Sequence, residues 1–428
     1  MKLAVKPAAL LKGQIDLPSS KSYSIRAFLI AACGGTSTII NPSDCDDAKV
    51  AIQVASKLGA TITRDRKNRW KTVAFRRKIK PTHINVGESA TVLRFLLPLL
   101  AFKGSRVTVV GEGTLKPRPN YFLTEVLRKM GITIIGRGQK ESVPIRIYGG
   151  RLRGGKVTID GGLSSQFISA LLAAVPALQE DTRLTITGKH IVSATYIVMT
   201  ELILRKAGII IKKVGQRTFF IKGNQKFKGL KTFRVPSDYG LAAFFLAAAA
   251  LVRSDLILKG HLKEDFIQSD AEILSFLRRM GARFKKTERS IKMTGPFELK
   301  GGDFSLKDCP DLVPIMSVMA LFAKGRTRLY NIGHVRAKES DRISTLRKEL
   351  LKVGANIVER KNELIIYPKP LYEHNVLLNP HHDHRLAMSF AILGLKLAVR
   401  IRDIECTSKS YPQFVGDLKR IGARVSLG

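Results

Sequence analysis

The heptapeptide RKMGITI at residues 128–134 decides the fold, because a phrase of the same kind occurs six times along the 428-residue chain. Each copy joins the end of an amphipathic segment to a glycine, and the glycine to a short run of β-branched or small apolar residues. Glycine commonly ends a helix because it readily adopts the left-handed backbone conformation. Basic side chains in the last turn before it interact favourably with the negative end of the helix dipole. Each copy therefore predicts a helix, a glycine stop and a strand. The other copies are KLGATIT (57–63), RKAGIII (205–211), RRMGARF (278–284), LKVGANI (351–357) and KRIGARV (419–425).

A second, much more apolar helical segment recurs once in each unit of about 70 residues. Helices that are apolar nearly all round are buried. Strands are predicted at 107–110, 183–187 and 255–258, so each unit mixes strands with two helices. This mixture indicates an α/β (α+β) repeat and not an all-helical one. The apolar segments span residues 20–33, 88–102, 164–178, 237–251, 311–323 and 383–395.

The apolar segments begin with polar and charged residues that are candidates for ligand binding. Most begin with Ser, Thr or Asp, which serve as ordinary N-caps. Basic residues also lie at or near these first turns: Lys21, Arg26, Arg94 and Arg385. Positive charge at the positive end of a helix is unfavourable unless an anion compensates it. The pattern therefore predicts a cleft in which buried helix N-termini bind anionic ligands.

The net charge is unusually positive, since 73 Lys and Arg against 34 Asp and Glu give +39. Such a charge attracts polyanions. The basic residues are spread along the whole chain, and no RNA-binding signature concentrates them. We therefore expect a basic solvated surface and no specific nucleic-acid partner.

Neither a membrane nor a disulfide framework is expected. The longest apolar run, residues 241–252, is too short to span a bilayer, and the N-terminus lacks the apolar stretch of a signal peptide. The four cysteines have no CxxC spacing, which suits a reducing compartment. These features predict a cytoplasmic protein.

Six motifs in order along the chain resemble the signature segments of the 5-enolpyruvylshikimate-3-phosphate (EPSP) synthase family, which is the 3-phosphoshikimate 1-carboxyvinyltransferase family. The resemblance extends from about residue 5 to residue 425. The motifs are LPSSKSYSIRA (17–27), KPRP (116–119), SSQF (164–167), RAKESDR (336–342), DHRLAM (383–388) and CTSKSYP (406–412).

The resemblance implies two similar globular domains, each of three βαβαββ units packed around buried parallel helices, joined by two crossover segments. One domain would span residues 19–233 and bind mainly shikimate 3-phosphate. Residues 1–18 and 234–428 would form the other, carrying the acid/base residues and part of the phosphoenolpyruvate site.

The activity implied is transfer of the enolpyruvyl group of phosphoenolpyruvate to the 5-hydroxyl of shikimate 3-phosphate, with release of phosphate. It is the sixth step of the shikimate pathway, which leads to chorismate and the aromatic amino acids. The family uses no metal or organic cofactor, and we expect a monomer.

The matching positions give two sets of binding residues. Both substrates carry a phosphate and a carboxylate, which a cationic site would bind. Shikimate 3-phosphate would contact Lys21, Ser22, Arg26, Ser164, Ser165, Gln166, Ser193, Tyr196, Asp311 and Lys338. Phosphoenolpyruvate would contact Lys21, Ala90, Arg118, Gln166, Arg342, Arg385 and Lys409.

The resemblance also implies three catalytic residues. The reaction is an addition followed by an elimination through a tetrahedral intermediate. It needs one group to take the hydroxyl proton and another to supply and reclaim a carbon-bound proton. Asp311 matches the first role and Glu339 the second, and Lys21 shares the proton transfers.

The chain departs from the family pattern at two places. The second apolar helix opens with Glu88-Ser89-Ala90-Thr91 where the family has Asn-Ala-Gly-Thr, which puts an acid near an anionic substrate. His334 replaces an asparagine just before RAKESDR. The sequence assigns no role to either Glu88 or His334.

Two other functions stay open at this point. A UDP-N-acetylglucosamine enolpyruvyl transferase would share the fold, but it would carry Lys-Asn in place of Lys21-Ser22 and a reactive cysteine near Arg118. An RNA-binding or RNA-end-processing relative would use the positive charge, but it would not need Asp311 and Glu339 together. The histidines at 381, 382 and 384 lack the spacing of a metal site, so no metal is expected.

Ala90 gives the first testable prediction. Its methyl group replaces a glycine hydrogen beside the expected phosphoenolpyruvate position and should narrow the pocket against glyphosate, which is longer. Replacing Ala90→Gly should therefore tighten glyphosate inhibition. The measurement is the inhibition constant of both proteins, and an unchanged constant in the variant contradicts the prediction.

Overall fold

The computed structural model describes residues 1–66, 68–74, 82–102, 106–263, 266–372 and 375–428. The chain divides into two compact units. One is Ser19–Val235, and the other combines Met1–Pro18 with Pro236–Gly428. Two chain segments therefore pass from one unit to the other, next to Pro18 and Val235.

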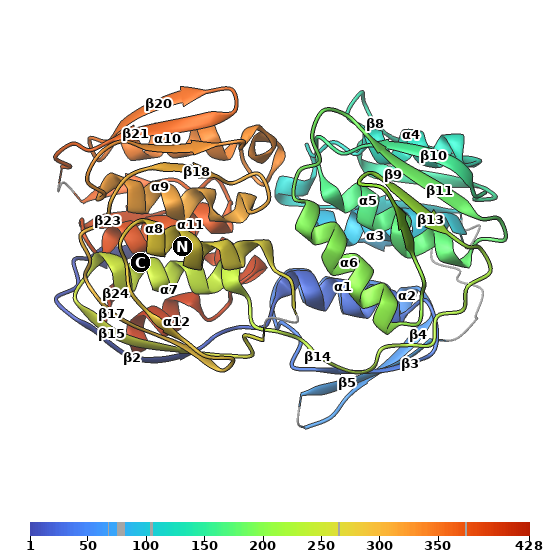
Figure 1. Ribbon diagram of the computed structural model, residues 1–428, viewed down its shortest axis with the longest axis horizontal. Helices are drawn as coiled ribbons and strands as arrows, with labels where there is room; N and C mark the ends of the chain where they lie inside the picture. Colours follow the sequence, from blue (N-terminus) through green and yellow to red (C-terminus); the bar gives the residue numbers. More distant parts are fainter. Residues whose placement is uncertain (67, 75–81, 103–105, 264–265, 373–374) are drawn as a thin grey trace. The chain divides into compact units, whose positions relative to one another are not determined.

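Each unit contains three four-stranded sheets in the part of the chain that the structure describes (Figure 1). All six sheets have the same pattern: the first two strands are parallel, and the third and fourth are each antiparallel to the strand before. This shared pattern confirms the repeat read from the sequence and the mixed α/β class. Six copies of one sheet and two helices are the predicted βαβαββ units.

The strands of the Ser19–Val235 unit group as follows. The first sheet is β14 (Lys231–Arg234), β3 (Thr36–Ile40), β5 (Arg69–Ala74) and β4 (Ala60–Arg64). The second is β6 (His83–Asn85), β7 (Val107–Val110), β9 (Ser142–Gly150) and β8 (Ile132–Arg137). The third is β10 (Gly155–Asp160), β11 (Thr182–Thr187), β13 (Thr218–Ile221) and β12 (Lys212–Val214).

The strands of the other unit follow the same order. The first sheet is β2 (Leu11–Asp16), β15 (Ser254–Lys259), β17 (Ser290–Gly295) and β16 (Lys285–Lys286). The second is β18 (Asp303–Ser305), β19 (Thr327–Tyr330), β21 (Glu363–Tyr367) and β20 (Asn356–Arg360). The third is β22 (Val376–Leu378), β23 (Val399–Ile401), β1 (Leu3–Lys6) and β24 (Arg424–Leu427).

The six repeated glycines do end helices. Gly59, Gly131, Gly208, Gly281, Gly354 and Gly422 all have φ between +84° and +98°, a conformation that favours glycine over residues with a Cβ atom. They follow α2 (Asp46–Lys57), α4 (Tyr121–Lys129), α6 (Ala194–Lys206), α8 (Ile273–Arg279), α10 (Arg342–Leu351) and α12 (Phe414–Arg420).

The six apolar segments form the buried helices. They are α1 (Lys21–Ala31), α3 (Ala90–Phe102), α5 (Ser165–Ala174), α7 (Tyr239–Leu251), α9 (Val313–Leu321) and α11 (His384–Gly394). Every residue of α7, α9 and α11 is buried, and these three helices contact one another. In the same unit α7 packs against β15 and β17, α9 against β19, β21 and α10, and α11 against β23.

In two of these apolar segments a 3₁₀ turn takes the place of one end of the α-helix. Residues 164–178 finish in a 3₁₀ turn, Val175–Ala177, which contains Pro176. Residues 311–323 begin with the 3₁₀ turn Pro310–Leu312 before α9 starts at Val313. Proline lacks the amide hydrogen that an α-helix interior needs, so it marks both transitions.

None of the described helices is long and apolar enough to cross a membrane.

Candidate active site

Arg342 organises the predicted site residues of the unit that combines Met1–Pro18 with Pro236–Gly428. It is the first residue of α10, and its side chain is 1% exposed. The guanidinium bonds three carboxylates: Nε to Asp383 at 2.8 Å, Nη1 to Asp311 at 2.8 Å and Nη2 to Glu339 at 3.0 Å. Carboxylate partners stabilise a buried guanidinium, and loss of one partner of a buried ion pair typically costs about 3–5 kcal/mol. This residue therefore fixes both acid/base candidates.

Asp311 also contacts a second buried guanidinium. Arg385 Nη2 lies 3.2 Å from its Oδ2, and Arg385 Nη1 donates to the Gly240 carbonyl at 2.7 Å. Burial disfavours the charged form of Asp311, but the charges of Arg385, Arg342 and Lys338 outweigh this effect and hold its pKa well below 3.8. Asp311 is thus a carboxylate at neutral pH.

Asp383, which the sequence does not assign, serves two purposes. It is the N-cap of α11 and accepts from the Arg385 amide at 3.0 Å, while its other oxygen accepts from Arg342 Nε. One buried carboxylate therefore contacts two of the three arginines predicted to bind phosphoenolpyruvate: Arg342 through its side chain and Arg385 through its backbone amide. Only its place as the first residue of DHRLAM hints at this role.

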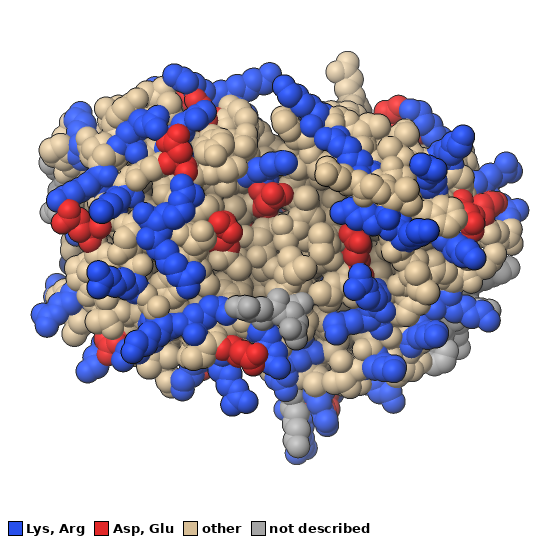
Figure 2. All heavy atoms as spheres, in the orientation of Figure 1, with Lys and Arg blue, Asp and Glu red and all other residues tan. Residues whose placement is uncertain are grey.

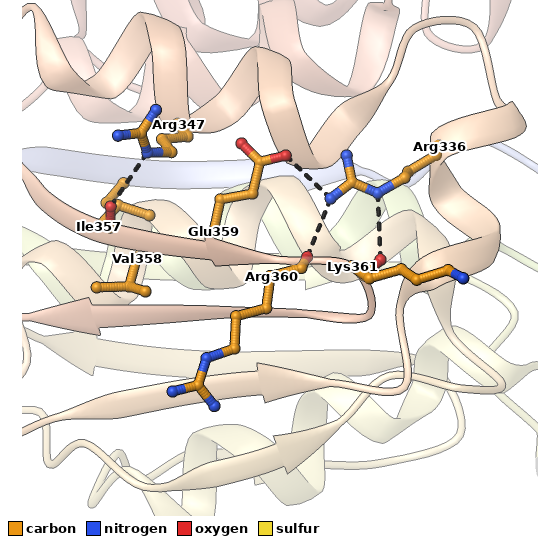
Figure 3. Close-up of a pocket in the computed structure, with 7 residues that line it drawn as sticks. All are labelled: Arg336, Arg347, Ile357, Val358, Glu359, Arg360 and Lys361. Carbon is orange, nitrogen blue, oxygen red and sulfur yellow. Dashed lines mark hydrogen bonds and ion pairs between the residues drawn. The ribbon is translucent and has the colours of Figure 1, made fainter.

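Glu339 and Lys338 lie on a loop that is fastened by Arg336. Arg336 donates to the Lys361 carbonyl at 3.2 Å and to the Arg360 carbonyl at 3.0 Å, and it pairs with Glu359 at 2.9 Å (Figure 3). These bonds tie the 3₁₀ turn Gly333–Ala337 to the β20–β21 hairpin. A shallow pocket of about 480 Å³ beside them is lined by these residues and Arg347.

Arg336 also holds the start of α10. Its Nη1 lies 2.8 Å from the Asp341 carboxylate, which caps the helix by accepting from the Ser344 amide at 3.1 Å. The segment from Arg336 to Arg342 is therefore fixed at both ends. Lys338 and Glu339 lie between these two anchors.

His334 lies in the same 3₁₀ turn. Its Nε2 is buried and makes no hydrogen bond with any residue that the structure describes. Burial, together with the positive charges of Lys338 and Arg342, lowers its pKa to about 3. The imidazole is therefore neutral at physiological pH.

Lys409 is the last residue of the 3₁₀ turn Ile404–Lys409 and is buried, with 6% exposure. The turn packs against α11, the helix that carries Arg385. In this unit the structure brings Asp311, Glu339, Arg342 and Arg385 into one network.

The remaining predicted residues belong to the Ser19–Val235 unit, where the cations have different partners. Arg26 on α1 is 1% exposed, and Nε donates to the Thr200 hydroxyl at 2.8 Å while Nη1 donates to the Ser22 carbonyl at 3.1 Å. Its guanidinium lies 5.7 Å from the Tyr196 ring centroid. Burial lowers the pKa of Arg26 to about 10, although Tyr196 and Tyr23 partly offset this effect.

Among the described residues no carboxylate pairs with Arg26, whereas Lys21 pairs with Asp47 at 3.1 Å. Arg26 therefore keeps a buried positive charge with neutral partners. Such a charge is costly without an anion, so this position suits an anionic ligand.

Gln166 is held by two residues of α3 in the same unit. Its side-chain oxygen accepts from Arg94 at 2.7 Å and its side-chain nitrogen donates to the Thr91 hydroxyl at 2.9 Å. Arg94 also donates to the Pro119 carbonyl at 3.1 Å, one residue after Arg118. Arg94 therefore joins α3, the start of α5 and the KPRP segment, a role that its sequence position near a helix start does not reveal.

The predicted serines lie at helix starts. Ser164 is the N-cap of α5 and accepts from the Gln166 amide at 3.3 Å, and Ser165 is buried. Ser193, with φ of +54°, is the N-cap of α6, and Tyr196 lies in the first turn of that helix. A helix start suits an anionic ligand because its first N–H groups lack an acceptor within the helix.

Arg118 follows the 3₁₀ turn Gly113–Leu115, and Ala90 is the first residue of α3; both are buried. The Glu88 carboxylate that precedes Ala90 bonds to Thr114 of that turn. The Glu88 carboxylate therefore accepts hydrogen bonds from the protein itself.

No metal centre emerges in the described ranges, where no three His, Cys, Asp or Glu residues are grouped to hold an ion. His381 and His382 instead approach Glu349 and Asp403, at 3.9 and 3.7 Å. The positive charge is also spread: Figure 2 shows Lys and Arg over the whole viewed face, with no single dense patch.

The chain matches the family model for EPSP synthase (3-phosphoshikimate 1-carboxyvinyltransferase) over residues 5–418. The 3-phosphoshikimate 1-carboxyvinyltransferase of Methanococcus aeolicus is 34% identical over 99% of this chain and 100% of its own length. That of Methanocaldococcus jannaschii is 35% identical over 99% of both chains.

A solved structure agrees with these sequence matches. The EPSP synthase of Acinetobacter baumannii superposes with a TM-score of 0.78 at 25% identity, covering 100% of both chains. Neither alternative function is favoured by these relatives. The chain belongs to the EPSP synthase (3-phosphoshikimate 1-carboxyvinyltransferase) family of enzymes.

Proposed function

We propose that this enzyme transfers the enolpyruvyl group of phosphoenolpyruvate to the 5-hydroxyl of shikimate 3-phosphate. The observation that carries the residue assignment is the placement of Asp311 and Glu339 on the one buried guanidinium of Arg342. Two carboxyl groups held on a rigid cationic centre suit a reaction that moves two different protons.

The Ser19–Val235 unit supplies the main shikimate 3-phosphate contacts in this proposal. Arg26 and Lys21 provide positive charge, and the starts of α5 and α6 provide Ser164, Ser165 and Ser193 as hydrogen-bonding groups. Gln166 is held by Arg94 and Thr91, so its amide meets the ligand in one orientation. Tyr196 completes this set beside Arg26.

The cations assigned to phosphoenolpyruvate are Lys21 and Arg118 in the Ser19–Val235 unit, and Arg342, Arg385 and Lys409 in the other unit. Arginine suits this task because its planar fork binds a carboxylate or a phosphate through two parallel hydrogen bonds. Ala90 and Gln166 contact the same substrate.

Addition begins when the 5-hydroxyl oxygen attacks the enol carbon of phosphoenolpyruvate. Asp311 accepts the hydroxyl proton while Glu339, which must carry a proton at the start of this step, delivers it to the methylene carbon and gives the tetrahedral intermediate. In the elimination, Glu339 takes a proton back from the methyl group as the carbon–oxygen bond to phosphate breaks. The leaving phosphate takes the proton that Asp311 accepted, which returns both carboxyl groups to their starting states. Lys21 shares the proton transfers, and Lys338 stabilises the negative charge that develops.

The low pKa of Asp311 in the free protein makes it a weak base. Anionic phosphoenolpyruvate at Arg385 and Arg342 would offset the positive charge that causes this shift. Substrate binding would thereby raise the proton affinity of Asp311 when the base is needed. We further propose that the enzyme works in the cytoplasm, as a monomer, and without a specific nucleic-acid partner.

The function is tested by phosphate release from phosphoenolpyruvate with and without shikimate 3-phosphate. Release should depend on shikimate 3-phosphate, and Asp311→Asn and Glu339→Gln should each lower kcat by about 10²–10⁴-fold, the usual contribution of a general acid or base. Asp303→Asn is the matched control, because this partly exposed carboxylate of the same unit pairs with Arg326 and Arg328, which belong to neither predicted binding set. Release without shikimate 3-phosphate, or wild-type rates in both variants, would overturn the assignment.

Arg26 gives a second prediction, with opposite effects on binding and on stability. Replacing Arg26→Met should weaken shikimate 3-phosphate binding by about 10–100-fold, because a buried charge-assisted contact is lost. The unliganded variant should be at least as stable as the wild type, because a buried charge without a carboxylate partner is removed.

Thermal unfolding with and without shikimate 3-phosphate measures both effects. The control is Arg217→Met, an exposed arginine of the same unit that donates to the Gly188 carbonyl. A strongly destabilised Arg26→Met protein that binds the ligand with wild-type affinity would contradict the prediction.

A further inference from the structure

Glu88 occupies a position where the family pattern has a neutral asparagine, two residues before α3. A carboxylate in this position would repel an anionic substrate if it faced the ligand. The structure instead directs this side chain at a neighbouring turn of the same unit. The contacts of that turn determine what Glu88 does.

The Glu88 carboxylate is bonded to the 3₁₀ turn Gly113–Leu115. One oxygen, Oε2, accepts from the Thr114 amide at 2.8 Å and from the Thr114 hydroxyl at 2.6 Å. Gly113 has φ of +46°, and a Cβ atom there would lie 2.4 Å from the carboxylate carbon of Glu88. The turn approaches the acid so closely that only glycine fits between them.

A second set of bonds joins the same two segments. Glu112 donates its amide to the Gly87 carbonyl at 2.8 Å, and its carboxylate accepts from the Asn85 side chain at 2.6 Å. Asn85 in turn accepts from the Gly87 amide at 2.8 Å. Hydrogen bonds therefore join residues 85–88 to residues 112–114. Of these bonds, those between Glu88 and Thr114 lie nearest to Arg118 along the chain.

The fastened turn leads directly to Arg118. Leu115 is fully buried, and its carbonyl accepts from the Arg118 amide at 3.1 Å. The Arg118 carbonyl then accepts from the Asn120 side chain at 3.1 Å. The backbone of Arg118 is thus set by the turn on one side and by Asn120 on the other.

We propose that Glu88 is a positioning residue for Arg118: its carboxylate holds the Gly113–Leu115 turn and thereby orients the guanidinium for phosphoenolpyruvate. This inference rests on the proposed function, which gives Arg118 its ligand. Charge-assisted bonds from a carboxylate to a backbone amide and a hydroxyl are stronger than those of a neutral amide side chain. The acid therefore restrains the turn more tightly than the asparagine it replaces.

Positioning and simple repulsion predict opposite results for the same substitution. If Glu88 orients Arg118, Glu88→Ala raises KM for phosphoenolpyruvate about tenfold with kcat little changed, because an interaction common to the ground state and transition state is weakened. If Glu88 mainly repels the substrate, the same change lowers that KM. The KM for shikimate 3-phosphate should stay at the wild-type value.

Two further variants refine the test. Glu88→Gln removes the charge but keeps one oxygen that can accept both Thr114 bonds, so its KM for phosphoenolpyruvate should rise by no more than about threefold. Thr114→Val removes only the hydroxyl bond and should raise the KM by a similar small factor. If Glu88→Ala does not fold, a lowered KM in Glu88→Gln or an unchanged KM in Thr114→Val overturns the proposal.

Amide hydrogen exchange gives a readout independent of activity: the Thr114 amide should exchange faster in Glu88→Ala. The matched control is Asp181→Ala, which removes another carboxylate of the same unit that accepts from a backbone amide, that of Gly223 at 2.9 Å. It should leave both the KM for phosphoenolpyruvate and the Thr114 amide unaffected.

The outcomes separate this inference from the proposed function. No phosphate release that depends on shikimate 3-phosphate in the wild type would overturn the function itself. An active wild type in which Glu88→Ala leaves the KM for phosphoenolpyruvate unchanged or lowers it would overturn only the positioning role.

Discussion

The buried guanidinium of Arg342 is the constraint on which the chemistry of one unit depends. It lies at the start of α10, where a positive helix end already disfavours a cation. Its charge is balanced by three carboxylates that come from different segments, namely Asp311, Glu339 and Asp383. Each of these carboxylates pairs with the cation, so each is also held in place by it. Structural stability and the arrangement of the acid/base groups therefore have the same cause.

The two units treat their buried cations differently. In the unit with Arg342, the buried guanidiniums of Arg342 and Arg385 pair with the protein's own carboxylates. In the Ser19–Val235 unit Arg26 is hydrogen-bonded to neutral groups, with no carboxylate partner among the described residues. Charge that the protein leaves uncompensated can be compensated by a phosphate. This difference supports the assignment of shikimate 3-phosphate mainly to one unit and of proton transfer to the other.

Much of the fold can be predicted from the sequence because its signals are local. A glycine after a basic helix end, as at Gly131 or Gly354, requires only the backbone conformation of that residue. The apolar segments predict buried helices for the same reason, since burial follows from composition. The ends of these helices are less predictable. In the segments 164–178 and 311–323, one end forms a 3₁₀ turn that contains a proline, Pro176 or Pro310.

The site is predicted less completely because its contacts join distant segments. The motifs identify Arg342 and Gln166, but Asp383 lies 41 residues from Arg342 and Arg94 lies 72 from Gln166. No spacing rule along the chain links such pairs. Glu88 is the clearest case: the sequence suggests an acid beside an anion, whereas the structure bonds it to Thr114. The assigned roles of the individual residues stay predictions until they are measured.

The most direct test of the central claim is the titration of the Asp311 carboxyl by carbon-13 NMR, with the signal assigned by its loss in Asp311→Asn. In the free protein the arginines should keep Asp311 ionised as the pH falls from about 7 to about 3, since its pKa lies well below 3.8. Phosphoenolpyruvate, added with shikimate 3-phosphate to an inactive Glu339→Gln protein, should raise the pKa of Asp311. A carboxyl that titrates at or above 3.8 in the free protein would contradict the account, because Arg342 and Arg385 would then not control it.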